Sequence, residues 1–106
     1  MDFDLLIIGS GPGGYVAAIR GAQLGLKVAI IEKEALGGVC LNWGCIPTKS
    51  FLRSAEVLKL IKASEQYGIK SEVGNVDISE VVKRSRSIAK RLSSGVEYLL
   101  KKNKVK

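Results

Sequence analysis

The chain has 106 residues, enough for one small domain, and its 46% hydrophobic and 25% charged residues are typical of a soluble globular protein. No apolar run reaches the roughly 18 to 20 residues that a membrane-spanning helix needs, so we expect no membrane partner. The absence of histidine and the presence of only two cysteines exclude a Ser-His or Cys-His catalytic pair and a disulfide-rich secreted scaffold within this chain, and no metal site is expected.

The net charge of +7 is unevenly distributed. Residues 1–50 carry as many acidic as basic side chains, so the whole excess lies in residues 51–106. No base-stacking aromatic residues are interleaved with the basic ones, so we expect no nucleic-acid partner. We favour a solvated helix face whose acidic partner surface lies elsewhere in a longer chain. The acidic N-terminus is unlike a signal or presequence, which predicts the bacterial cytoplasm or, after processing, an organellar matrix.

The first half of the chain predicts a βαβ unit. Residues 4–8 are a continuous apolar run that ends at glycine, the pattern of a strand buried on both faces. Residues 11–24 predict a helix packed closely on a sheet, and Gly25 suits its C-terminal end. Residues 27–31 predict a second buried strand. Two strands joined by one helix predict parallel pairing.

The second half predicts two long helices after a loop at residues 33–44. The first helix has Pro47 in its first turn and extends to about residue 66, and residues 68–75 form a break. The second helix begins at Asp77 or Ser79 and ends near Asn103, after which Val105 begins a new strand. Its expected apolar stripe contains Ile78, Val81, Val82, Ile88, Ala89, Leu92, Val96 and Leu99. The first helix has apolar side chains at helical spacing, at Leu52, Ala55, Leu58 and Ile61.

A glycine-rich turn, GSGPGG, lies between the first expected strand and helix. In its GxGxxG spacing Gly9 permits a tight turn, Gly11 lets a pyrophosphate approach the backbone, and Gly14 lets the helix lie close to the strand. Glu32 ends the second expected strand, where an acidic side chain can bond ribose hydroxyls. The turn predicts dinucleotide binding without separating FAD from NAD, and a purely structural turn is the alternative. The candidate residues are Gly9, Ser10, Gly11, Pro12, Gly14 and Glu32.

A closely spaced cysteine pair follows, within GGVCLNWGCIPTK at residues 37–49, and indicates redox chemistry. In a regular helix Cys40 and Cys45 would lie on different faces and too far apart, so a disulfide requires a distorted backbone between them. Strain makes a disulfide easier to reduce. A helix N-terminus lowers a thiol pKa, so the reduced Cys45 is expected to persist as a thiolate near neutral pH. Two inert buried thiols are the alternative.

This segment resembles the active-site segment of the flavoprotein disulfide reductases, and Leu-Asn-Trp-Gly between the cysteines is most similar to the dihydrolipoamide dehydrogenase branch of that family. The resemblance covers essentially the whole chain. It implies that the glycine turn binds the ADP half of FAD. It also implies that Cys40 is the interchange thiol, that Cys45 is the charge-transfer thiol against the flavin, and that Lys49 lies near the reactive edge of the flavin. Further candidate cofactor-binding residues are Lys33, Gly38 and Val39.

Three of these positions have another interpretation or depart from the family pattern. Val39 stands where many relatives have threonine, so a hydroxyl contact to the flavin phosphates is missing there. The alternative interpretation of Lys49 is an ordinary solvated residue on a helix. Trp43 is interpreted as a core aromatic side chain.

The expected fold is α/β, the start of a doubly wound, Rossmann-like parallel FAD-binding sheet with two long helices in the crossover. Residues 1–49 would hold the βαβ fingerprint and the redox-disulfide loop, and residues 50–106 the two amphipathic helices and the start of a strand. Two buried strands leave open sheet edges and apolar helix stripes, so we expect an incomplete domain within a longer chain.

The resemblance implies an FAD-dependent enzyme that oxidises protein-bound dihydrolipoyl groups with NAD, acting on the lipoyl domain of a 2-oxoacid dehydrogenase complex as a homodimer. Regions absent here would bind NAD and supply a His-Glu pair, so we expect the 106-residue chain to be inactive alone. One alternative is another disulfide reductase, such as glutathione or mercuric reductase. The other is a non-catalytic flavin-binding fragment.

Overall fold

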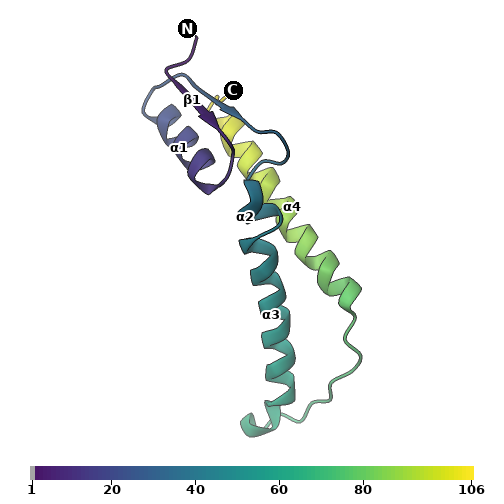
Figure 1. Cartoon of the computed structure of the whole chain (residues 1–106). Coiled ribbons are helices and arrows are strands. Elements are labelled where there is room, and N and C mark those ends of the chain that lie inside the picture. Colours follow the sequence, from purple (N-terminus) through teal and green to yellow (C-terminus); the bar gives the residue numbers. More distant parts are fainter. Residues whose placement is uncertain (1) are drawn as a thin grey trace.

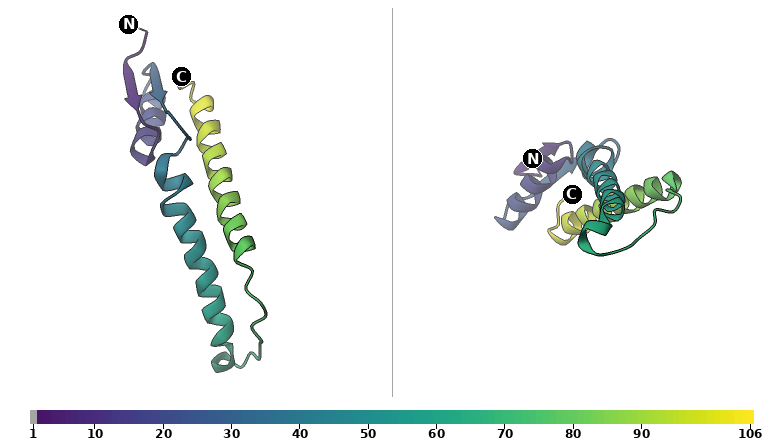
Figure 2. Two further views of the ribbon diagram at one scale, coloured as in Figure 1. Left: turned by 45° about the vertical axis from the view of Figure 1, so that its right-hand side comes forward. Right: turned by 90° about the horizontal axis from the view of Figure 1, so that it is seen from below.

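The computed structural model describes residues 2–106, and Met1 lies outside the described residues. The elements in chain order are β1 (Leu5–Ile8), α1 (Pro12–Gln23), β2 (Val28–Ile31), α2 (Gly38–Asn42), α3 (Cys45–Lys62), the 3-10 helix η1 (Ser64–Tyr67) and α4 (Ile78–Lys102). The molecule measures 65 × 25 × 17 Å, with the sheet at one end and α3 and α4 extending from it as a hairpin (Figures 1 and 2). The expected α/β fold is confirmed.

The strands pair in parallel, as the βαβ pattern predicts, with Leu5 opposite Val28 and Ile8 opposite Ile31. Beyond β2, on the edge away from β1, the backbone of Lys106 donates to the carbonyl of Val28 at 3.0 Å and accepts from the N–H of Ile30 at 2.7 Å. These two bonds are the first backbone pairing of the strand expected to begin at Val105. The two helices expected in the crossover lie between β2 and this position.

Helix α1 lies close to the sheet because its inner face is small. Ala18 is fully buried, and a Cβ placed on Gly21 would lie 3.1 Å from Leu5 Cδ2. At the start of the helix, a Cβ on Gly14 would collide with the carbonyl oxygen of Gly9. These contacts confirm the close helix–strand packing that the glycine spacing predicts.

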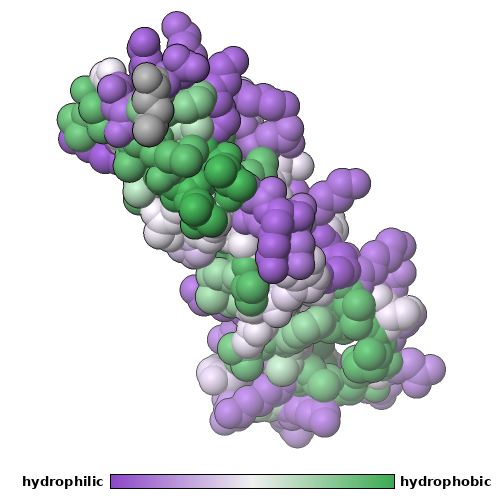
Figure 3. Space-filling model, turned by 45° about the horizontal axis from the view of Figure 1, so that its top comes forward, coloured by the Kyte–Doolittle hydropathy of each residue, from purple (hydrophilic) through white to green (hydrophobic). Residues whose placement is uncertain are grey.

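One face of the sheet is covered and the other is open. The buried core contains Ala18 and Val28 from the βαβ unit together with Val96 and Leu100 from α4. On the opposite face Leu6 and Ile8 are exposed, Ile8 to 84%. Figure 3 shows apolar side chains gathered at the sheet end of the molecule and again over the long helices. The sequence predicts that other elements cover both faces of the sheet. Within residues 2–106 one face is covered.

Several boundaries differ from the expectations. The loop at residues 33–44 contains the short helix α2, and α3 ends at Lys62 with η1 after it. The buried seam of α4 consists of Ser85, Ala89, Val96 and Leu100. The expected stripe shares only Ala89 and Val96 with that seam, and α4 packs chiefly on α3 and also on α2 and α1. Of the expected α3 positions, Leu52 is exposed. No helix within residues 2–106 is long and apolar enough to cross a membrane.

The start of α4 is capped by Asp77, the first of the two residues expected there. Its Oδ1 accepts from the N–H of Ser79 at 2.9 Å and from the Ser79 hydroxyl at 2.6 Å. The hydroxyl bond, followed by the backbone bonds from Glu80 and Ser79, holds the pKa of Asp77 below its ordinary value. Asp77 therefore fixes where the chain re-enters a helix after the exposed segment at residues 69–76.

The neighbouring glycines of α1 provide a matched test of its packing. Gly14→Ala is expected to lower the free energy of unfolding by about 1–3 kcal/mol, because the methyl group meets rigid backbone. Gly13→Ala meets nothing within 4 Å and is expected to leave that free energy unchanged or raise it by up to about 1 kcal/mol. Urea unfolding followed by circular dichroism measures both. Equal effects of the two substitutions would contradict the packing described for α1.

Candidate functional site

The two cysteines form a disulfide where two helices meet. Cys40 lies in α2 and Cys45 is the first residue of α3, with their Cα atoms 4.7 Å apart. The helices are separated at Trp43 and Gly44, so the expected backbone distortion is confirmed. The break is tight, because a Cβ on Gly44 would lie 3.1 Å from the carbonyl oxygen of Val39. Cys40 is half-buried and Cys45 is exposed.

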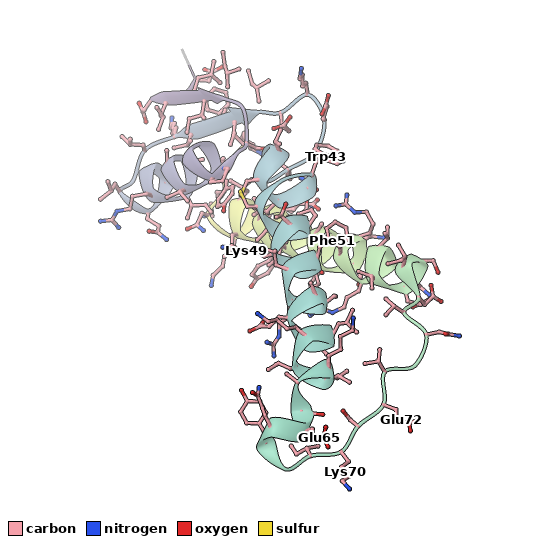
Figure 4. The ribbon with its side chains drawn as sticks, turned by 60° about the horizontal axis from the view of Figure 1, so that its bottom comes forward. Trp43, Lys49, Phe51, Glu65, Lys70 and Glu72 are labelled. Atoms are coloured by element: carbon pink, nitrogen blue, oxygen red, sulfur yellow. A yellow bond between two sulfur atoms is a disulfide. The ribbon has the colours of Figure 1, made fainter. Side chains whose placement is uncertain are left out.

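The N-terminus of α3 provides a favourable environment for a thiolate. Its N-cap is Gly44, no side chain caps the helix, and its first turn contains no acidic residue. Cys45 therefore lies at the positive end of an 18-residue helix. Lys49 lies one turn later and is exposed. Figure 4 shows it on the same side of α3 as the disulfide. These groups all favour negative charge on Cys45 after reduction.

Ser10 joins three segments of the chain. It is completely buried. Its N–H and hydroxyl both donate to Oε2 of Glu32, at 2.9 and 2.6 Å. The N–H of Gly37 donates to the Ser10 carbonyl at 3.1 Å and to its hydroxyl oxygen at 3.3 Å. The glycine turn, the end of β2 and the loop before α2 are thus bonded through one side chain. The direct cofactor contact expected of Ser10 stays a prediction.

Glu32 lies beside the glycine turn, as its position after β2 predicts. The Ser10 hydroxyl bond first, then the backbone N–H groups of Glu34 and Ser10, lower the pKa of Glu32 to about 2. The carboxylate is therefore ionised and fixed in direction at neutral pH. Its second oxygen, Oε1, accepts only the Glu34 N–H bond at 2.9 Å among the hydrogen bonds within residues 2–106. That oxygen has capacity for a further donor, such as a ribose hydroxyl.

The glycine turn has the shape that a pyrophosphate requires. Helix α1 begins after Gly11 with Pro12 in its first turn, no side-chain cap and no acidic residue there. A Cβ placed on Gly11 or Gly13 would meet no atom within 4 Å, so the space beside these residues is open. Free N–H groups at an uncapped helix start bind phosphate, so the residues present fit the ADP half of FAD.

Gly38 packs against the glycine turn. A Cβ on Gly38 would lie 2.8 Å from the Cα of Gly11, and Gly38 itself has a φ of +64°. The preceding Gly37 has a φ of +95° and bonds Ser10. Sequence reasoning missed this bonding role of Gly37. The signal was present in the adjacent glycines, because two backbone positions with positive φ require them.

The remaining candidate residues lie around this centre. Lys33 and Val39 are exposed, which leaves both free to contact a ligand. Trp43 is 55% exposed, so its interpretation as a core aromatic is wrong. It lies at the break between α2 and α3 and lines a shallow hollow with Arg86 and Lys90 of α4, facing away from Lys49 (Figure 4). The structure thus brings the glycine turn, Glu32 and Gly38 together, and places Lys49 one turn of α3 after Cys45.

A family model described as pyridine nucleotide-disulphide oxidoreductase matches residues 3–106. The chain is 60% identical over 103 residues to the dihydrolipoyl dehydrogenase of Zymomonas mobilis and 59% identical over 105 residues to that of Rhizobium etli, with 97% of this chain covered in each case. It is 47% identical over 104 residues to the dihydrolipoyl dehydrogenase of Bacillus subtilis, with 98% covered. The chain spans about 22% of the length of each of these relatives.

The Glu32 contacts predict a pH dependence of stability. The folded-state pKa of Glu32 lies below the unfolded value, so its stabilising effect is complete above about pH 4.5 and is lost as the pH falls toward 2. Glu32→Gln is expected to flatten the fall in the free energy of unfolding over that window. Glu34→Gln, at an exposed neighbouring position, is the matched control and is expected to retain the wild-type slope. Denaturant titrations at several pH values measure this, and an unchanged slope in Glu32→Gln would contradict the role of the Ser10 contacts.

Proposed function

This chain belongs to the pyridine nucleotide-disulphide oxidoreductase family, and we propose that it is the flavin-binding, disulfide-bearing segment of an enzyme that oxidises protein-bound dihydrolipoyl groups with NAD. The observation that carries the proposal is the Cys40–Cys45 disulfide, placed with Cys45 at the N-terminus of α3 and joined through Gly38 to the glycine turn. The names of the relatives support the choice of substrate over glutathione or mercuric ion.

Some residues of this chain are proposed to bind the cofactor, and others to carry out the redox chemistry. The N–H groups of Gly11 and Gly13 hold the pyrophosphate of FAD, and Oε1 of Glu32, which has capacity beyond its bond from Glu34, accepts from the ribose. Gly38 lets the redox helices lie against that turn. When bound, FAD would supply a two-electron acceptor for the reduced cysteine pair. Lys33, Val39 and Lys49 are the further candidate contacts to it.

The proposed disulfide exchange proceeds in two displacements. A substrate thiolate attacks Sγ of Cys40, the Cys40–Cys45 bond breaks, and Cys45 leaves as a thiolate. The second substrate thiol, after losing its proton, attacks the substrate sulfur of the mixed disulfide and releases Cys40. The substrate becomes a cyclic disulfide, and the cysteine pair gains two electrons and one proton, on Cys40, while Cys45 stays a thiolate and the other substrate proton passes to solvent. The N-terminus of α3 stabilises Cys45 as the leaving group, which favours attack on Cys40.

The whole protein's setting follows from the same proposal. The lipoyl domain of a 2-oxoacid dehydrogenase complex is the partner, NAD binds to regions outside these 106 residues, and the enzyme is a homodimer. The bacterial cytoplasm or an organellar matrix is its location. The 106-residue chain contains no histidine, so it lacks the acid/base pair that the family resemblance implies.

The activity is tested on the protein that carries this segment. Cys40→Ser and Cys45→Ser are each expected to reduce dihydrolipoamide-dependent NAD reduction to background, because either change removes the disulfide. Ser94→Ala, at an exposed position on α4, is the control and should keep wild-type activity. The 106-residue chain alone should show no turnover. NADH-dependent reduction of oxidised glutathione at least as fast as that of lipoamide would reassign the substrate, and activity retained in Cys40→Ser would overturn the proposal.

Flavin binding is tested by a substitution that the fold tolerates. A Cβ on Gly11 meets nothing within 4 Å, and its φ of −64° suits any residue. Gly11→Ala is therefore expected to keep the wild-type free energy of unfolding while weakening FAD binding about tenfold or more, because the methyl group enters the space for the pyrophosphate. Gly95→Ala in α4 also has open space and is the control. Fluorescence titration of FAD measures affinity, and equal affinity in Gly11→Ala would contradict the assignment of the turn.

A further inference from the structure

The carbonyl oxygen of Leu36 is a junction between the redox loop and α4. It accepts a hydrogen bond from Nδ2 of Asn42 at 3.0 Å and another from the hydroxyl of Ser93 at 2.7 Å. The same Asn42 amide donates to the carbonyl of Gly38 at 2.9 Å. Three segments therefore meet here: the loop before α2, the last residue of α2, and the middle of α4. We call this set of contacts the Leu36 clamp.

The clamp holds the C-terminal end of a very short helix whose start is already fixed to the glycine turn through Gly37 and Gly38. Helix α2 contains five residues, has no side-chain cap, and is too short to be stable from its own backbone bonds. Leu41 is its buried residue. Cys40 lies in this helix, whereas Cys45 begins the much longer α3. The geometry of the cysteine pair therefore depends on how firmly α2 is held, above all after reduction removes the covalent link.

Asn42 occupies the critical place in this arrangement. It is the last residue of α2, immediately before the break at Trp43 and Gly44. Its side-chain amide donates to the carbonyl of Gly38, the first residue of α2, and to the carbonyl of Leu36, two residues earlier. These two bonds link the end of α2 to its start. Ser93 then ties that closed unit to α4, which also packs against α3. Loop, α2 and α4 thus form one frame around Cys40.

We propose that Asn42 and Ser93 are positioning residues that hold Cys40 opposite Cys45 in the reduced protein and so set the equilibrium between dithiol and disulfide. This inference deepens the proposed function and rests on it, because it concerns the same redox pair. With the clamp intact, the two thiols stay at the short separation that the disulfide requires. Without it, α2 moves away from α3 on reduction, the effective concentration of one thiol near the other falls, and the disulfide becomes easier to reduce.

The equilibrium is measured in the 106-residue chain with mixtures of reduced and oxidised dithiothreitol, without flavin or NAD. One reduced dithiothreitol gives two electrons and two protons to the Cys40–Cys45 disulfide and becomes a cyclic disulfide, so the reaction is balanced. Asn42→Ala is expected to shift the equilibrium about tenfold toward the dithiol, which makes the midpoint potential about 30 mV less negative. Ser93→Ala, which removes one bond, is expected to shift it about threefold. Alkylation of free thiols followed by mass measurement gives the reduced fraction.

Two substitutions separate positioning from a general effect on stability. Asn103 caps the C-terminal end of α4 and its Nδ2 donates to Leu99 O at 2.8 Å, the same i to i−4 contact that Asn42 makes with Gly38. Asn103→Ala therefore removes a comparable bond away from the cysteines and is expected to keep the wild-type potential. Ser93→Thr retains a hydroxyl and is expected to restore the potential lost in Ser93→Ala. Circular dichroism confirms that each variant is folded before its potential is measured.

The outcomes are distinct for the clamp and for the proposed function. A wild-type potential in both Asn42→Ala and Ser93→Ala would overturn the clamp while leaving the redox role of the cysteines intact. An equal shift in Asn103→Ala would also overturn it, because the effect would then be one of general stability. A wild-type pair that cannot be reduced and reoxidised reversibly would overturn the clamp and the proposed function together.

Discussion

The hydrogen bonds between Ser10 and Glu32 connect the ends of the two strands, and the rest of the site depends on them. A completely buried hydroxyl that lost these partners would leave unsatisfied polar groups in the interior, which is costly. The same side chain accepts from Gly37, so the loop leading to the cysteines is fixed to the glycine turn. The proposed cofactor site and the cysteine pair therefore share one anchoring point, although their residues come from different elements.

Glycines make this shared anchoring possible. Gly38 lies against Gly11, and Gly14 lies against Gly9, at distances that admit no side chain between the backbones. Each contact brings two chain segments closer than ordinary packing of side chains would allow. The βαβ unit and the helix that carries Cys40 are thus nested together through bare backbone. A fold built in this way places the disulfide and the glycine turn, the proposed site of the flavin pyrophosphate, on one support.

The features with strong local signals could be predicted from the sequence. The two strands, α1, the long helices and the disulfide at a helix start follow from apolar runs, glycine spacing and the cysteine motif. Helix α2 was missed, because five residues carry no periodic signal and tertiary contacts alone stabilise them. Trp43 was misjudged because hydrophobicity does not tell which side of a short break a ring will face. The bond of Ser93 to Leu36 joins positions far apart in the sequence, which no local pattern can show.

The pairing of Lys106 with β2 joins the ends of a very long connection. Closing such a connection as flexible chain would cost conformational entropy that rises with the logarithm of its length. The α3–α4 hairpin removes most of that freedom through local contacts, and it returns the chain to the sheet beside β2 (Figure 2). The tip of the hairpin, around Glu65, Lys70 and Glu72, is exposed along its whole length (Figure 4). Extra residues there would add only about 0.6 kcal/mol for each doubling of the tip's length, which makes the tip the natural place for this segment to vary in evolution.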